Sequence, residues 1–187
     1  MILGLLLVSA AGCGVTFSVP PGDPSGEVDP SAFVGTWIPE EVTHTVTSPI
    51  EISADGNVAT VTDVVSSTTM GQFRGVEIGD GVVAYFPYRD AWRIFRVRLI
   101  DDDQRMELTT IDPDVLRSDI ESNEITGTIS VDGLIRVTAD TEALAGYLTG
   151  HPAVWLSESG YYSREEIESP SMTIAERTRP PKELWQS

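Results

Sequence analysis

Two arginines in an apolar stretch are the side chains best suited to hold a charged ligand. Arg96 and Arg98 alternate with Val97 and Leu99, so on an extended strand the two arginines share one face. Guanidinium groups bind carboxylates or phosphates through paired hydrogen bonds, and nearby aromatic rings can hold an apolar body. Alternatively, both arginines lie in solvent or opposite neighbouring carboxylates. The candidate ligand-binding residues are Arg96, Arg98, Trp92, Phe86 and Tyr88.

Catalytic motifs are not recognisable in this chain. The only histidines, His44 and His151, lie far apart, and neither belongs to a ligand or base motif. The chain has no Gly-x-Ser-x-Gly elbow, no glycine-rich phosphate loop and no metalloprotease helix signature. Paired carboxylates for glycoside hydrolysis depend on a separation that a sequence does not give. We therefore expect a protein that is not an enzyme, and keep a hydrolase as the third hypothesis.

Aspartate clusters are the only candidate metal ligands. Three aspartates occupy 101–103, but calcium needs six or more oxygens, and the spacing lacks the glycine and distal glutamate of a calcium-binding helical loop. The acidic residues in 112–121 are predicted to lie in an irregular connection. We expect solvated loops, no metal and no cofactor.

The charge balance excludes one class of partner. The chain has 29 acidic and 12 basic residues, for a formal net charge of -17. Nucleic-acid binding depends on Lys and Arg that neutralise phosphates, so we exclude it. An acidic surface also disfavours docking on anionic lipid, and attachment to a membrane would need another device.

An apolar run at the N-terminus, with the cysteine that follows it, could provide the membrane attachment. Ile2–Val8 is too short to span a bilayer and is typical of a signal-peptide core. The following Ala10-Ala11-Gly12-Cys13 resembles the bacterial lipobox. This resemblance implies that 1–12 are removed and that the Cys13 sulfur receives a diacylglyceryl group. An ordinary secretory leader that happens to precede a cysteine is the alternative.

The lipobox resemblance implies an address outside the cytosol. Two or three acyl chains hold a domain on a membrane almost permanently. The partner would then be the membrane, reached through the lipid on Cys13, while no protein partner is indicated. Gly14 follows the cysteine where an aspartate commonly signals inner-membrane retention, so the resemblance favours the outer membrane of a diderm, and otherwise the outer face of the plasma membrane.

Composition divides the mature chain into three parts. Residues 13–30 are rich in proline and glycine, and we predict a solvated, extended linker that lifts the domain off the bilayer. Residues 31–166 form the predicted domain. Residues 167–187 again combine prolines with charges, which predicts a disordered tail.

Short segments of strand pattern, divided by glycine turns, fill the predicted domain. Asp55-Gly56-Asn57, Gly79-Asp80-Gly81 and Asp132-Gly133 each join two such segments, which predicts an antiparallel meander. One helix is predicted over Thr141–Gly150, capped by Asp140 or Thr141. The expected fold is mainly β, an up-and-down antiparallel barrel or strongly curled meander sheet with one late α-helix. The remaining predicted strands are Thr36–Val46, Ala91–Ile100, Arg105–Ile111, Glu124–Val131, Leu134–Ala139 and one near Tyr161–Arg164.

A glycine and a tryptophan at the start of the first predicted barrel strand carry a second resemblance. Gly35-Thr36-Trp37 is similar to the Gly-x-Trp signature of lipocalins and related calycin barrels. The resemblance implies that Trp37 plugs the closed end of the barrel and that Arg164, at the end of the last strand, covers it. It also implies an interior that binds a small apolar or amphiphilic ligand. A structural or assembly-partner lipoprotein with a filled barrel is the second hypothesis.

Overall fold

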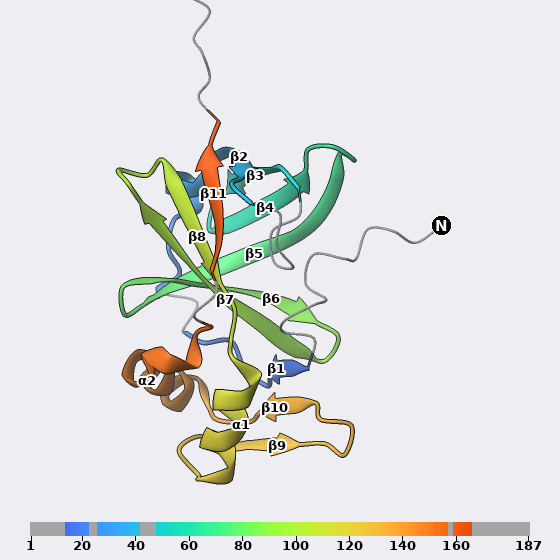
Figure 1. Cartoon of the computed structure of the whole chain (residues 1–187), viewed down its shortest axis with the longest axis vertical. Helices are drawn as coiled ribbons and strands as arrows, with labels where there is room; N and C mark the ends of the chain where they lie inside the picture. Colours follow the sequence, from blue (N-terminus) through green and yellow to red (C-terminus); the bar gives the residue numbers. More distant parts are fainter. Residues whose placement is uncertain (1–13, 23–25, 42–47, 157–158, 166–187) are drawn as a thin grey trace, which may run out of the picture.

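A closed barrel of eight antiparallel strands forms the centre of the computed structural model, which describes residues 14–22, 26–41, 48–156 and 159–165 (Figure 1). Consecutive strands pair from β2 to β8, and β11 closes the ring between β8 and β2. The predicted antiparallel barrel is therefore confirmed. The barrel strands are β2 (Gly35–Pro39), β3 (Ile50–Asp55), β4 (Val58–Asp63), β5 (Thr68–Ile78), β6 (Gly81–Tyr88), β7 (Ala91–Ile100), β8 (Arg105–Thr109) and β11 (Gly160–Arg164).

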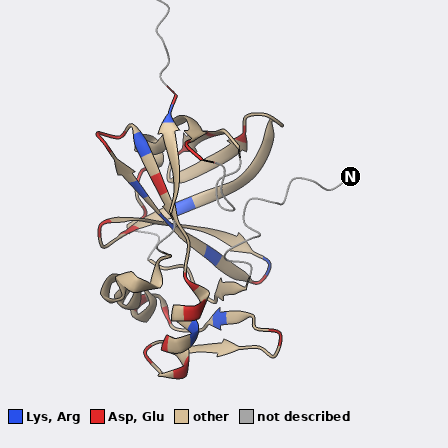
Figure 2. Ribbon diagram, in the orientation of Figure 1, with Lys and Arg blue, Asp and Glu red and all other residues tan. Residues whose placement is uncertain are grey.

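The predicted glycine turns connect these strands. Gly56 and Gly79 adopt φ values of 57° and 65°, the left-handed conformation that a tight hairpin turn needs and that glycine adopts without strain. Asp101, Asp102 and Asp103 also have positive φ and are exposed in the turn between β7 and β8. The aspartate triplet is thus a solvated turn, as the sequence predicts. Figure 2 shows acidic residues mainly in turns and along α1, while most arginines lie on strands.

Strand direction gives the barrel two distinct ends. The turns after β3, β5 and β7 lie at the end where β2 begins and β11 stops, which we call the Gly35 end. The turns after β4 and β6 lie at the opposite end, where β8 stops, which we call the Thr109 end. The Gly35 end carries the short helix η2 (Pro30–Phe33) directly before β2.

A small sheet and two helices adjoin the Thr109 end, because the chain between β8 and β11 leaves the barrel there (Figure 1). In this sheet β1 runs parallel to β10 and β10 runs antiparallel to β9, while Phe17 of β1 pairs with Trp92 of β7. The elements are β1 (Val15–Phe17), α1 (Pro113–Glu121), β9 (Gly127–Ile129), β10 (Ile135–Val137), α2 (Thr141–Gly150) and η3 (Pro152–Val154).

The segment predicted to be a solvated linker is folded onto the domain wherever the structure describes it. Val15 and Phe17 are buried in β1, Pro30 is buried in η2, and Glu27 pairs with Val76 of β5. The folded domain thus begins near 15 rather than at 31. The proline-rich composition predicted a linker, whereas β1 is only three residues long. Its two buried apolar side chains are too few to form a recognisable strand pattern. Residues 1–13 and 166–187, with the predicted signal peptide, Cys13 and the predicted tail, lie outside the described residues.

One of the two helices was predicted from the sequence and the other was not. Helix α2 spans the predicted residues, its N-terminus is capped by the Asp140 carboxylate, which accepts from the Ala143 amide at 2.8 Å, and Leu144, Tyr147 and Leu148 are buried. Helix α1 replaces the predicted irregular connection. Asp112 caps it and Pro113 begins it, and its apolar residues Val115, Leu116 and Ile120 pack on the core. The helix is only nine residues long, so few positions carry its pattern in the sequence.

Two apolar cores lie on the two faces of the β6–β7 wall. The barrel interior contains Trp37, Ile52, Ala84, Val97 and Tyr162. The opposite face of the same wall packs with the small sheet and helices, through residues that include Val83, Tyr85 and Ile94. Burial on both faces explains the unbroken apolar run at 82–86, which a half-solvated strand would not have.

Candidate functional site

The barrel interior is incompletely filled. A cavity of about 180 Å³ lies within it, lined by large apolar side chains from most of the barrel strands and, outside the barrel, by Val15 and Phe17 of β1. An engineered apolar cavity of about 150 Å³ binds benzene, whereas sites for drug-sized ligands start near 300 Å³. The barrel cavity therefore fits one aromatic ring or a short alkyl chain. Its lining includes Ile52, Met70, Phe73, Phe86, Phe95 and Leu108.

Three phenylalanines form one wall of the cavity. The Phe73 ring contacts the rings of Phe86 and Phe95 edge to face, at centroid distances of 5.0 and 5.2 Å. Edge-to-face contacts fix the orientation of the rings. The wall is thus a defined apolar surface against which a flat ligand can pack.

Polar groups on the β5–β6 wall are already paired with each other. The Glu27 side chain, only 4 % exposed, accepts hydrogen bonds from the Tyr85 hydroxyl at 2.5 Å and from the Arg74 guanidinium at 3.1 Å. Burial alone would raise the pKa of Glu27, but the hydrogen bonds from Tyr85, Arg74 and Asn57 hold it below its usual value. Burial and the adjacent Glu27 raise the pKa of the Tyr85 hydroxyl. This cluster fastens the N-terminal segment, whose Val28 amide donates to the Gly75 carbonyl at 2.9 Å.

The Thr109 end of the cavity carries two other polar residues, Arg93 and Thr110. The Arg93 guanidinium lies 3.8 Å from the centre of the Tyr88 ring, a cation–π contact. The Thr110 hydroxyl is buried and has no hydrogen-bond partner among the described residues. A buried hydroxyl without a hydrogen-bond partner destabilises the fold. A polar atom of a ligand that bonds to the Thr110 hydroxyl would remove this cost.

Trp37 and Arg164 lie in contact at the Gly35 end of the barrel. Trp37 is fully buried, and its indole nitrogen donates to the Phe33 carbonyl at 2.8 Å. The Arg164 guanidinium lies 4.7 Å from the ring centre and donates to the Ala32 carbonyl at 2.7 Å. Gly35, with φ of 139°, turns the chain from η2 into β2. These contacts tie η2 to the Gly35 end of the barrel.

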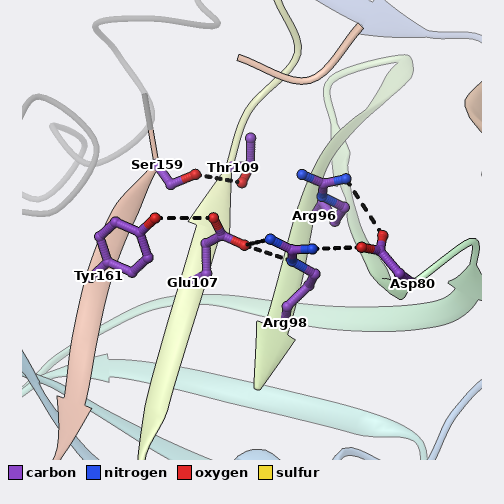
Figure 3. Close-up of polar contacts among 7 residues, drawn as sticks. All are labelled: Asp80, Arg96, Arg98, Glu107, Thr109, Ser159 and Tyr161. Carbon is purple, nitrogen blue, oxygen red and sulfur yellow. Dashed lines mark hydrogen bonds and ion pairs between the residues drawn. The ribbon is translucent and has the colours of Figure 1, made fainter. Parts of the chain in front are cut away.

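Neither arginine of the pair lines the cavity, and Figure 3 shows that both face carboxylates instead. Arg98 forms ion pairs with Glu107 of β8 and with Asp80 of the β5–β6 turn. Glu107, 6 % exposed, also accepts from the Tyr161 hydroxyl at 3.2 Å. Burial alone would raise the pKa of Glu107, but hydrogen bonds from Ser159 and Arg98 hold it below its usual value. We call this set the outer polar cluster: Asp80, Arg96, Arg98, Glu107, Thr109, Ser159 and Tyr161.

Arg96 connects the barrel to the segment between β8 and β11. Its guanidinium is 3.7 Å from the Asp80 carboxylate and 5.2 Å from the centre of the Trp155 ring, just beyond η3. Burial and the neighbouring Arg98 lower the pKa of Arg96. Thr109, almost completely buried, shares a hydrogen bond with Ser159 at 3.1 Å. The outer polar cluster thus joins β7, β8, β11 and the β5–β6 turn.

Of the five candidate ligand-binding residues, only Phe86 lines the cavity. Arg96 and Arg98 face neighbouring carboxylates, which is the alternative that the sequence left open. Trp92 contacts Tyr85 on the outer wall, and Tyr88 lies beneath Arg93. The sequence analysis missed Arg93 and Thr110. A comparison of the two faces of β7 would have found Arg93, because it shares its face with Phe95, Val97 and Leu99, the more apolar set.

The remaining candidates for chemistry are isolated. His151 stacks on Tyr147 on the surface of α2, and its Nε2 lies 4.0 Å from Glu124, while His44 lies outside the described residues. Within the described ranges, no three His, Cys, Asp or Glu side chains lie close enough to hold a metal ion. In the same part of the chain, no helix has the length and apolar character needed to cross a membrane.

Comparison with family models, with curated proteins and with solved structures finds no match for this chain.

Proposed function

We propose that the barrel binds a small, mainly apolar ligand in its interior. The observation that carries this proposal is the apolar cavity of about 180 Å³ between the barrel strands. A natural core is usually packed to near-crystalline density, so a cavity of this size sacrifices contacts that side chains could have made. A bound ligand recovers those contacts, and the aromatic wall favours a flat or slender molecule.

The second part of the proposal concerns location. The lipobox at Cys13 and the absence of any second cysteine in the sequence support a lipid-anchored protein of the cell envelope. The lipid attached to Cys13 would hold the barrel at a membrane, where small apolar molecules are concentrated. With both the cavity and the anchor, the protein would be a carrier of such molecules in the cell envelope.

A thermal-shift titration with benzene, toluene and indole tests cavity binding. A ligand at one hundred times its Kd adds about 2.7 kcal/mol, which raises the Tm of a domain of this size by about 5 to 10 °C. The variant Ala84→Leu extends a side chain into the cavity and should abolish the shift, because Ala84 lines it. The matched control Ala143→Leu, on the exposed face of α2, should keep it.

The assembly-partner hypothesis makes the opposite prediction. A barrel that serves only through its outer surface gains nothing from these probes. No shift with any of the three ligands, at concentrations up to their solubility, would therefore reject the carrier and favour the second hypothesis.

A further inference from the structure

The start of β1 and the β9–β10 turn lie together at one edge of the small sheet (Figure 1). The Gly14 carbonyl accepts a hydrogen bond from the Ile135 amide at 2.6 Å. A Cβ placed on Gly14 would lie 3.8 Å from the Leu134 side chain. Gly14, the first residue that the structure describes, is therefore held beside this turn.

The β9–β10 turn presents apolar side chains to solvent. Val131 is 109 % exposed and Leu134 is 50 % exposed, although both are large apolar residues. A solvated hairpin turn normally carries polar residues or glycine, such as Asp132 and Gly133 between these two positions. Two exposed apolar side chains flanking one tight turn form a small projecting apolar tip.

Hydrogen bonds with Ser130 pair some of the backbone groups of the tip. The Ser130 amide donates to the Leu134 carbonyl at 2.9 Å, and the Gly133 amide donates to the Ser130 carbonyl at 3.0 Å. The Leu134 amide donates to the Ser130 hydroxyl at 2.9 Å, and this hydroxyl in turn donates to the Asp132 carboxylate. Three of the backbone groups of residues 131–134 therefore already have partners, which lowers the cost of placing this turn at a lipid surface.

We propose that the β9–β10 turn, residues 131–134, is a bilayer contact site. This inference rests on the proposed lipid on Cys13. One peptide unit of about 3.8 Å joins Cys13 to Gly14, so a lipidated cysteine brings its membrane to the edge of the small sheet without a spacer. Val131 and Leu134 then enter the boundary between headgroups and acyl chains. The site takes a zwitterionic lipid surface, because Asp132 and the chain's net charge of -17 repel anionic lipid.

Tryptophan scanning of the lipidated full chain on vesicles tests this contact. The vesicles contain phosphatidylcholine with brominated acyl chains, which quench indole fluorescence on contact. The fluorescence added by Val131→Trp should shift to shorter wavelength and be lost on brominated vesicles. The matched control is Val65→Trp, 79 % exposed in the β4–β5 turn, which lies far along the longest axis from the β9–β10 turn (Figure 1). Its added fluorescence should keep its wavelength and intensity.

Vesicle flotation separates the failure of the anchor from the failure of the contact. Equal quenching of the two variants on vesicles that float with the protein would overturn the contact and leave the anchor intact. Loss of flotation would overturn the anchor and the contact together. A shift at Val131→Trp that needs no vesicles and grows with protein concentration would assign the tip to contact between two copies, and would also overturn the proposal.

Discussion

The Arg164 guanidinium lies over the ring of Trp37, 4.7 Å from its centre, at the point where the last barrel strand ends beside the first. The Arg164 side chain also donates to Ala32 of η2, so one side chain fastens three elements. Because Trp37 is fully buried, this contact is shielded from solvent on the side of the ring. The Arg164 side chain thus joins β11, β2 and η2 at the Gly35 end.

Replacing Arg164 should therefore remove the contact that joins β11, β2 and η2. We expect Arg164→Gln to lower the free energy of unfolding by about 1 to 2 kcal/mol, the range of a partly desolvated cation–π contact plus one hydrogen bond. Urea denaturation measures the loss. The control Arg117→Gln, which breaks an exposed ion pair within α1, should cost less than about 0.5 kcal/mol. Equal losses for both variants would show that Arg164 is only a surface residue.

Two adjacent threonines offer a matched test of hydroxyl pairing. The Thr109 hydroxyl is buried and bonded to Ser159, whereas the Thr110 hydroxyl is buried without a partner in the described chain. We expect Thr109→Val to destabilise the protein by about 1 to 2 kcal/mol and Thr110→Val to be neutral or stabilising. Thermal or urea unfolding of the ligand-free protein measures both. A loss at Thr110→Val as large as that at Thr109→Val would contradict the assignment.

Acid should weaken the fold through Glu107. Its folded-state pKa lies below the usual 4.5, so its charged form stabilises the protein fully above that value, and this contribution is lost as the pH falls through the folded-state pKa. We expect Glu107→Gln to cost about 1 to 3 kcal/mol at pH 7, because Arg98 loses its buried partner.

Urea denaturation at pH 7 and near pH 3 should show this cost shrinking in acid. Glu51→Gln, exposed on β3, serves as the control and should differ little from the parent at either pH. A cost for Glu107→Gln that stays constant between the two values would mean that the carboxylate is not coupled to folding.

The sequence predicts the barrel strands well because the interior selects one face of each. Glycine turns at 56 and 79 set where strands end, and alternation sets which side chains point inward. Alternation is absent from β6, where both faces are buried, and that strand was predicted from the glycine turn before it. Alternation misleads at 124–131, where a clean pattern yields only the short β9, outside the barrel.

The site was harder to predict than the fold. Arg96 and Arg98 have the chemistry of an anion clamp, but whether a strand face points inward depends on the whole set of side chains on it. Arg93 shares the inward face of β7 with Phe95. Because Arg93 is charged, its position does not look like one that faces an apolar interior. Thr110 carries no sequence signal at all, because a missing hydrogen-bond partner is a property of three-dimensional packing.

Lipidation of Cys13 stays a prediction, and it has a direct test. We expect Cys13→Ala to abolish labelling by radioactive palmitate and to release the protein from membranes into the soluble fraction. The physical reason is that the acyl chains attached to Cys13 supply the binding that an acidic surface does not. Labelling that persists in the variant would show that the lipobox has been misread.

The central claim is that the barrel interior binds a small apolar molecule, and diffraction from crystals soaked in bromobenzene tests it most directly. The anomalous signal of bromine locates the ligand without reference to the surrounding density. We expect one strong bromine peak inside the barrel, among Met70, Phe73 and Phe95. An interior that contains no bromine and is filled by side chains would contradict the claim.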